Sequence, residues 1–235
     1  LKKNDEMASS ALRVLSMAYK KNSKTIFVGL QGMIDKPRSE VKSAIELCKQ
    51  AGIRVLMITG DHKLTAQAIA KQVGISGRSI EGKDLNRLTD SQLKQTLKEV
   101  NIVARSSPEH KVRILNILQK EKQVVAMTGD GINDAPALKK ADVGIAMAIK
   151  GTDIARDASD MVLLNDNFNS IVQAIKQGRH VYDNIKKFIR YLLSVNFSEV
   201  LLILVAILMK FPLPLLPLQI LWINLATDGL PALAL

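Results

Sequence analysis

The sequence predicts an α/β domain followed by a long helix and a hairpin of two membrane-spanning helices. Between residues 25 and 164, short apolar segments alternate with segments whose apolar residues recur at helical spacing. This alternation is typical of a mostly parallel sheet with helices on both faces. Residues 191–209 and 215–235 are almost wholly apolar, and each is close to the length of about 20 residues that a membrane-spanning helix needs.

The elements of the α/β region are expected in a regular order. Strands are predicted at residues 25–33, 53–58, 101–104, 124–127, 143–147 and 161–164. Helices are predicted at residues 1–22, 37–50, 63–73 and 108–120, with a short helix after Asp134. Pro37 and Pro108 each open a helix, because proline fits the first helical turn, and Gly52 follows the end of one.

A long amphipathic helix is predicted from residue 169 onward. It continues without a helix breaker from residues 169–190 into the apolar stretch 191–209, and residues 210–214 then form a short turn. The alternative is a pair of buried core helices. We disfavour it because the preceding domain is too small to bury two helices that are apolar on all sides.

Charge and cysteine content narrow the class of protein. The formal net charge is +11, and part of it gathers just before the first apolar stretch, at Lys176, Arg179, Lys186, Lys187 and Arg190. Basic residues beside a membrane span mark its cytoplasmic side. Nucleic-acid binding is disfavoured because aromatic residues are not interleaved with this charge. The single cysteine, Cys48, excludes a disulfide within the chain and fits a reducing compartment.

Carboxylates follow the predicted strand 124–127. Thr128-Gly129-Asp130 forms a tight turn there, and Asn133 and Asp134 come directly after it. Open α/β sheets hold ligands at the carboxyl ends of their strands, and Mg²⁺ prefers oxygen ligands. The alternative is an acidic surface turn. A second Thr-Gly-Asp, Thr59-Gly60-Asp61, also follows an apolar strand and favours the functional interpretation.

These residues suit phosphoryl transfer, which depends on positioning and charge neutralisation. Asp130 is the expected Mg²⁺ ligand, with Asn133 and Asp134 supporting the loop. The Thr59-Gly60-Asp61 turn offers a hydroxyl and a backbone N–H to phosphoryl oxygens. Lys111, in the first turn of the helix that Pro108 opens, can neutralise developing negative charge. A solvated surface lysine is the alternative for Lys111.

The motifs resemble those of the P-type ion-pumping ATPases, which are haloacid-dehalogenase-like phosphotransferases. The likeness is strongest to type II pumps, and among them to calcium pumps of the sarcoplasmic-reticulum type. It rests on the two Thr-Gly-Asp turns and on four further strings: Asp35-Lys36-Pro37-Arg38, Ser107-Pro108-Glu109-His110-Lys111, Gly151-Thr152 and Ala158-Ser159-Asp160. In that family the residues named above have the same catalytic roles, with Mg²⁺ as cofactor, ATP as substrate and Ca²⁺ as the transported ion.

The resemblance also implies a domain organisation. Residues 1–22 would end a nucleotide-binding domain, 23–168 would form a cytoplasmic phosphorylation domain, 169–190 a stalk helix, and 191–235 two spans of a multi-pass membrane protein. The actuator, most of the nucleotide-binding domain and the other spans would lie outside this chain. We therefore expect the lipid bilayer and the missing remainder of the pump as partners.

The nucleophile of the family is missing from this chain. The family phosphorylates an Asp in an Asp-Lys-Thr-Gly-Thr motif, and no such string occurs; Asp35 is followed by Lys36-Pro37 instead. In related folds the strand that carries the nucleophile is central, so we expect unpaired strand edges here. A further departure is Ala148, where the family usually has Gly.

Polar residues interrupt both apolar stretches. They lie three or four positions apart, so each set shares one helical face: Asn196 and Glu199 in the first stretch, and Asn224, Thr227 and Asp228 in the second. A carboxylate within a membrane costs at least about 2.5 kcal/mol and usually marks an ion path. Interhelical hydrogen bonding explains the amides but not two acids. Gly229 and Pro231 are expected to break the helix just after Asp228.

Having both Asn196 and Glu199 resembles the calcium-pump pattern with two ion sites. We interpret the chain as part of an ATP-driven Ca²⁺ pump, inactive by itself because the phosphorylated Asp is absent. The alternatives are a pump for Na⁺, Mn²⁺ or H⁺, a truncated pump acting as a membrane regulator, and a soluble phosphatase. The membrane hairpin and the missing nucleophile argue against the phosphatase.

Overall fold

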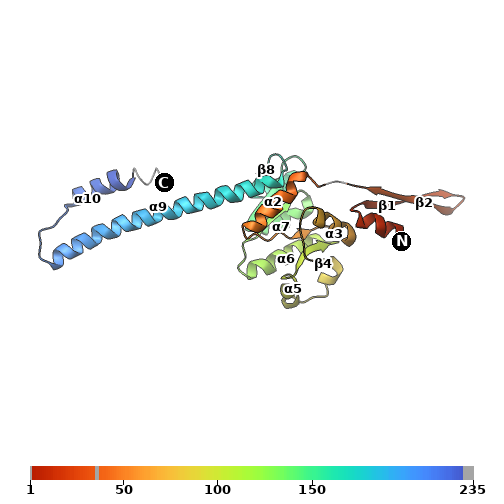
Figure 1. The fold of residues 1–235 in the computed structure, drawn as a ribbon, viewed down its shortest axis with the longest axis horizontal. Coiled ribbons are helices and arrows are strands. Elements are labelled where there is room, and N and C mark those ends of the chain that lie inside the picture. The colour runs from red at the N-terminus through yellow and green to blue at the C-terminus, as the bar shows by residue number, and fades with distance from the viewer. Residues whose placement is uncertain (1, 35–36, 230–235) are drawn as a thin grey trace. The chain divides into compact units, whose positions relative to one another are not determined.

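The fold is described from a computed structural model, which covers residues 2–34 and 37–229. The chain divides into two compact units, Leu1–Val172 and Gln173–Leu235. In the first unit, short parallel strands alternate with helices that lie around them (Figure 1). Asp35 and Lys36, which belong to a motif quoted above, lie outside the described residues.

The N-terminal region corrects one prediction. Helix α1 covers only Lys2–Ser9, and the chain then forms strands β1 (Arg13–Lys21) and β2 (Lys24–Met33), which pair antiparallel. The predicted helix 1–22 is therefore wrong beyond Ser9. Asn22 and Ser23 have φ values of 48° and 61°, and two such residues form the two-residue turn that suits a hairpin. Pairing with β2 thus overrides the near-helical spacing of apolar residues.

The first half of the α/β region forms a three-stranded parallel sheet in the order β3-β5-β4. Its elements follow the chain as α2 (Ser39–Gln50), β3 (Met57–Ile58), α3 (Lys63–Gln72), β4 (Arg78–Glu81), α4 (Gly82–Leu85), α5 (Asp90–Thr96), β5 (Val100–Ala104) and α6 (Pro108–Lys120). Helix α6 has the predicted bounds. Helix α2 begins two residues after Pro37, and β3 is much shorter than the predicted strand 53–58.

The second half forms another three-stranded parallel sheet in the order β6-β7-β8. Its elements are β6 (Ala126–Gly129), η1 (Ile132–Asp134), α7 (Ala135–Lys140), β7 (Val143–Met147), α8 (Asp153–Asp157) and β8 (Met161–Leu163). Strand β6 begins two residues later than predicted, and β7 has the predicted bounds.

Two separate sheets replace the single sheet that alternation alone predicts. Among the residues that the structure describes, β3 pairs only with β5 and β6 pairs only with β7, so each is an edge strand. The predicted α/β fold with parallel strands is confirmed, and the described residues leave strand edges unpaired in both sheets.

Three apolar clusters hold the first unit together. One joins α2, α3 and β5, with the side chain of Phe168 packed against it. A second lies among α4, α5, β5 and α6, and the third is centred on Leu138, Ala146 and Ala155. Cys48, on α2, is a free thiol and is 3% exposed. Burial raises the pKa of this thiol.

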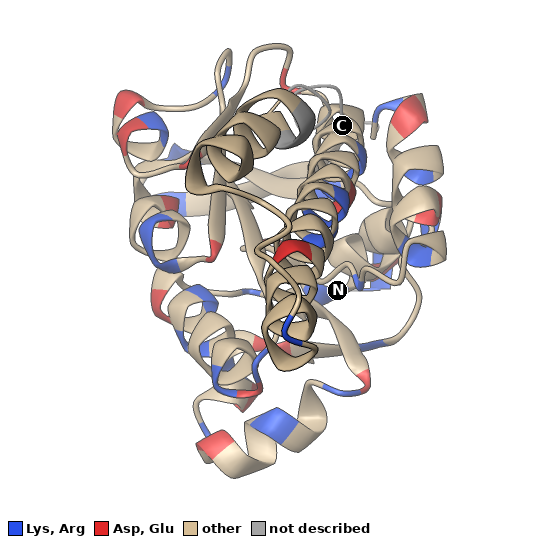
Figure 2. Cartoon of the chain, turned by 90° about the vertical axis from the view of Figure 1, so that its left-hand side faces the viewer, with Lys and Arg blue, Asp and Glu red and all other residues tan. Residues whose placement is uncertain are grey.

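The second unit contains most of helix α9 (Phe168–Leu208), which is 41 residues long. It is long and apolar enough to cross a membrane. The second apolar stretch begins as α10 (Pro217–Ile223) and passes into a π-helical segment, η2 (Asn224–Asp228). Gly229 keeps helical backbone angles, so it does not break the helix, and Pro231 lies outside the described residues. Lys and Arg are distributed over many of the helices (Figure 2).

Candidate active site

The Thr59-Gly60-Asp61 turn follows β3 and is fastened to the residues that follow β5. Arg105 N–H donates to the Asp61 carbonyl at 2.9 Å, and Ser106 N–H donates to the Thr59 carbonyl at 3.0 Å. The Thr59 hydroxyl donates to an Asp61 carboxylate oxygen at 2.9 Å. The turn is therefore held by backbone contacts, while the two side chains engage each other.

The Asp130 loop follows β6, the edge strand of the other sheet. Asp134 is 7% exposed, and its Oδ2 accepts from the N–H groups of Asp130 and Gly131 at 3.3 and 3.4 Å. A Cβ at Gly129 would lie 2.5 Å from the Cβ of Asp134, so this position needs glycine. Asp130 and Asn133 are exposed. The loop thus turns inward at Asp134 and presents Asp130 to the solvent.

Lys111 and Asp134 come together across the two halves of the α/β region. The Lys111 ammonium lies 2.5 Å from Asp134 Oδ1, and these side chains are 18% and 10% exposed. Lys111 comes from α6, which packs beside the first sheet, whereas Asp134 ends η1. The pair ties the two halves together at the carboxyl ends of their strands. Its catalytic role stays a prediction.

His110 fixes the first turn of α6 just before Lys111. Its Nδ1 accepts from the Ser107 N–H at 3.0 Å, and its Nε2 lies 2.8 Å from Asn86 Oδ1. Burial lowers the pKa of His110, with the Glu109 carboxylate acting in the opposite sense. Because Nδ1 accepts a hydrogen bond, the neutral imidazole would have its proton on Nε2, facing Asn86. His110 belongs to the motif of residues 107–111, but the sequence alone predicts no role for it.

Within the described part of the chain, the two predicted turns do not contact each other through hydrogen bonds, and they do not form a cluster of metal ligands. Among the described residues, no hydrogen bond joins the Thr59 turn to the Asp130 loop, and no three His, Cys, Asp or Glu side chains converge as a metal cluster. Mg²⁺ is commonly bound by one or two carboxylates together with phosphate oxygens and water. The exposed side chain of Asp130 can supply one such carboxylate.

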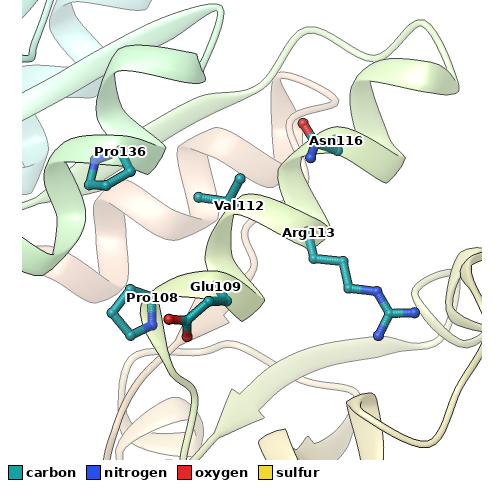
Figure 3. A pocket seen from close by; sticks show the side chains of 6 residues that line it. All are labelled: Pro108, Glu109, Val112, Arg113, Asn116 and Pro136. Atoms are coloured by element: carbon teal, nitrogen blue, oxygen red, sulfur yellow. The ribbon is translucent and has the colours of Figure 1, made fainter.

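A pocket of about 420 Å³ lies on the outer face of α6 (Figure 3). It is lined by Pro108, Glu109, Val112, Arg113, Asn116 and Pro136. Arg113 points out of it, since its guanidinium donates to Asp90 and to the carbonyls of Leu85 and Leu88. None of the predicted catalytic residues lines this pocket.

The polar residues of the apolar helices form a second candidate site. Glu199 Oε1 and Asn224 Oδ1 are buried and have no hydrogen-bond partner. Asn196 is exposed and donates to the Leu192 carbonyl at 2.8 Å. The backbone of Thr227 and Asp228 is part of the π-helical segment, and their side chains lie outside the described residues. Buried acceptor oxygens without donors are suited to a cation.

Comparisons with known proteins agree with this geometry. Residues 10–142 match the haloacid dehalogenase-like hydrolase family, and residues 111–175 match a second family of the same description. The chain belongs to the haloacid dehalogenase-like hydrolases. In addition, residues 212–235 match the family described as cation transporting ATPase, C-terminus. This membership explains the parallel strands and the turns at their carboxyl ends.

Among its relatives, the haloacid dehalogenase-like chain is 51% identical to a calcium-transporting ATPase of Bacillus subtilis, with 97% of this chain and 27% of that protein covered. It is 48% identical to an endoplasmic reticulum-type calcium-transporting ATPase 3 of Arabidopsis thaliana, with 94% of this chain and 23% of that protein covered. The chain thus spans about a quarter of the length of these relatives.

A solved structure has a similar fold. The crystal structure of a zinc-transporting PIB-type ATPase in the E2·Pi state has a TM-score of 0.66 and 25% identity, with 99% of this chain and 32% of that chain covered. The resemblance to P-type ATPases, predicted from the motifs, is confirmed by these comparisons.

Proposed function

We propose that this chain is part of an ATP-driven pump that moves Ca²⁺ out of the cytoplasm through an aspartyl-phosphate intermediate. The proposal is carried by two buried oxygens without hydrogen-bond partners in the apolar segments, Glu199 Oε1 on α9 and Asn224 Oδ1 on η2. A buried acceptor left without a donor costs about 1–3 kcal/mol. A bound cation would remove that cost, and the names of the relatives fit the same interpretation.

The residues of the α/β unit suit phosphorylation of an Asp elsewhere in the whole protein. Lys111 would neutralise charge on the phosphoryl oxygens, and Asp134 holds its ammonium in place at 2.5 Å. The Thr59 hydroxyl and the N–H of Gly60 would contact those oxygens, with Asp61 orienting the hydroxyl. Asn133 would support the loop that bears Asp130.

A Mg²⁺ ion fits the donor set at Asp130. The side chain is exposed at the end of β6, while its carbonyl accepts the Thr152 N–H at 2.9 Å, so the backbone is fixed and the carboxylate faces outward. When bound, Mg²⁺ supplies charge neutralisation to a phosphate. Asp130 would hold the ion, and the other carboxylate would come from the phosphorylated Asp outside this chain.

The ligand chemistry favours Ca²⁺ over the zinc named for the similar structure. Zn²⁺ prefers thiolate and imidazole ligands, and the only cysteine of the chain is Cys48 in the α/β unit. Ca²⁺ takes six to eight oxygen ligands in flexible geometry. The set of Asn196, Glu199, Asn224, Thr227 and Asp228 would supply several of them. We place these residues in the bilayer and the α/β unit in the cytoplasm.

The test uses the full-length protein and measures phosphoenzyme formed from labelled ATP with Mg²⁺. Asp130→Asn should abolish it, and wild-type levels would remove Asp130 from the metal site. Asp228→Asn should remove Ca²⁺ activation, while Glu199→Gln should weaken it and lower its cooperativity. The wild-type protein is also titrated with Na⁺ and with Mn²⁺, and the phosphoenzyme formed is measured in the same way. If another ion activates the wild type and Ca²⁺ does not, the calcium assignment is wrong and only the pump class remains.

A further inference from the structure

A short loop crosses beside the backbone of Asp130. It runs from Ala148 to Thr152, between β7 and α8, and its last residue donates its N–H to the Asp130 carbonyl at 2.9 Å. The Thr152 hydroxyl also caps α8 by accepting from the Ala155 N–H at 3.3 Å. A Cβ at Gly151 would collide with the Met147 carbonyl, so the loop lies close against the end of β7. Any shift of this loop moves the hydrogen bond to Asp130.

The middle of the loop is anchored by Asp166, a residue that no sequence motif assigned to the site. Its two carboxylate oxygens accept from the N–H groups of Ile149 and Lys150 at 3.0 and 2.8 Å. The first end of the loop is also fixed, because the Arg156 guanidinium donates to the Ala148 carbonyl at 2.6 Å. Asp166 thus holds two adjacent backbone groups in one forked contact.

We propose that Asp166 is a positioning residue for phosphoryl transfer, which holds the loop 148–152 so that Thr152 can fix the backbone of Asp130. The inference rests on the proposed function, because it assigns Asp166 to the same Mg²⁺ site. Asp166 lies two residues before Phe168, the first residue of α9, whose side chain packs against the core of the first unit. The anchor therefore stands on a fixed part of the fold.

The environment of Asp166 supports an ionised anchor. Burial alone would raise its pKa, but the backbone N–H groups of residues 148–150 and the charge of Arg38 together outweigh burial, so the pKa of Asp166 is lowered. The residue is 9% exposed and has a φ of 50°, a left-handed conformation that Asp and Asn tolerate better than other non-glycine residues. Asn and Gly can therefore replace it without backbone strain.

The experiment measures the Mg²⁺ concentration for half-maximal phosphorylation in the full-length protein. Asp166→Asn keeps one acceptor oxygen and should raise this midpoint roughly threefold, whereas Asp166→Gly keeps none and should raise it roughly tenfold, the lower end of what outer-shell groups contribute at metal sites. Phosphoenzyme is expressed per folded molecule, so loss of stability alone does not move the midpoint. The Asn variant serves as the test if the Gly variant does not fold.

The matched control is Asp142→Asn. Asp142 also accepts a backbone N–H, from Val125 at 2.8 Å, but it precedes β7 and so lies at the amino end of the second sheet, away from Asp130. Its midpoint should equal that of the wild type. An unchanged midpoint in both Asp166 variants would overturn the inference, as would an equal shift in the control. If the wild type shows no Mg²⁺-dependent phosphorylation, the proposed function fails, and the inference fails with it.

Discussion

Removing one partner of the ion pair between Lys111 and Asp134 should destabilise the fold more than removing one partner of an exposed ion pair, because it leaves a largely buried group without its partner. The two side chains are 18% and 10% exposed and their charged atoms are 2.5 Å apart. Removing one partner of a fully buried pair costs about 3–5 kcal/mol, whereas exposed pairs contribute about 0.2–1 kcal/mol. Because Lys111 keeps some contact with water, we expect Asp134→Asn to lower the free energy of unfolding by about 2–3 kcal/mol.

The single cysteine allows the loss in the free energy of unfolding to be measured in the whole chain in detergent. Cys48 is 3% exposed, so a thiol reagent should reach it only when the first unit opens. A loss of 2–3 kcal/mol corresponds to an increase of roughly 30–150-fold in the open population, and so in the labelling rate. Cys48→Ala combined with Ala146→Cys moves the reporter to the second sheet, where Ala146 is fully buried.

A double-mutant cycle separates the pair from its surroundings. Lys111→Met and the combination Lys111→Met/Asp134→Asn complete the cycle, whose coupling energy should be about 1–3 kcal/mol. The control pair is Arg78–Glu99, which is 2.7 Å apart but has side chains that are 77% and 65% exposed. Glu99→Gln should change the labelling rate by less than about fivefold. A coupling energy no larger than that of the control pair would refute the argument from burial.

Two further predictions follow from the site. The contribution of His110 to the free energy of unfolding should be constant above the ordinary histidine pKa of 6.5 and decrease as the pH falls below it, because the lowered pKa of His110 makes the folded state bind its proton less readily than the unfolded state. Urea unfolding at several pH values measures this, and His110→Gln should remove up to about 1.4 kcal/mol per pH unit of the slope. Residues 1–235, incubated with labelled ATP and Mg²⁺, should form no acid-stable phosphoenzyme; hydroxylamine-sensitive label on Asp35 would contradict the view that the acceptor is missing.

Local signals predicted the helices well where caps were strong. Helix α6 has the predicted bounds, since Pro108 occupies its first turn and Ser107 and His110 form a reciprocal cap. The hairpin of β1 and β2 was mispredicted because its apolar residues fit helical spacing, while its turn depends on left-handed Asn22 and Ser23. Strand β4 was not predicted, because its four residues, Arg78–Glu81, include a single apolar side chain.

In the candidate site too, some residues can be predicted from the sequence and others cannot. Lys111, Asp130 and Asp134 could be named because they stand in motifs at strand ends and helix starts. Asp166 could not be named, because it follows β8 but accepts hydrogen bonds from Ile149 and Lys150 in the loop that follows β7. The residues next to Asp166 in the sequence give no sign of that contact. Contacts that only tertiary folding creates are outside the reach of spacing arguments.

Strands β3 and β6, two of the four edge strands of the parallel sheets, indicate where the proposed site would be completed. Thr59-Gly60-Asp61 follows β3 and Thr128-Gly129-Asp130 follows β6, and each of these strands lacks a partner on one side. A parallel strand inserted between them would join the two sheets, and its own carboxyl end would then lie between the two turns. That is where an acceptor Asp would be close to both Lys111 and Asp130. In the proposed function, the phosphorylated Asp would lie on such a strand, in a part of the whole protein outside these 235 residues.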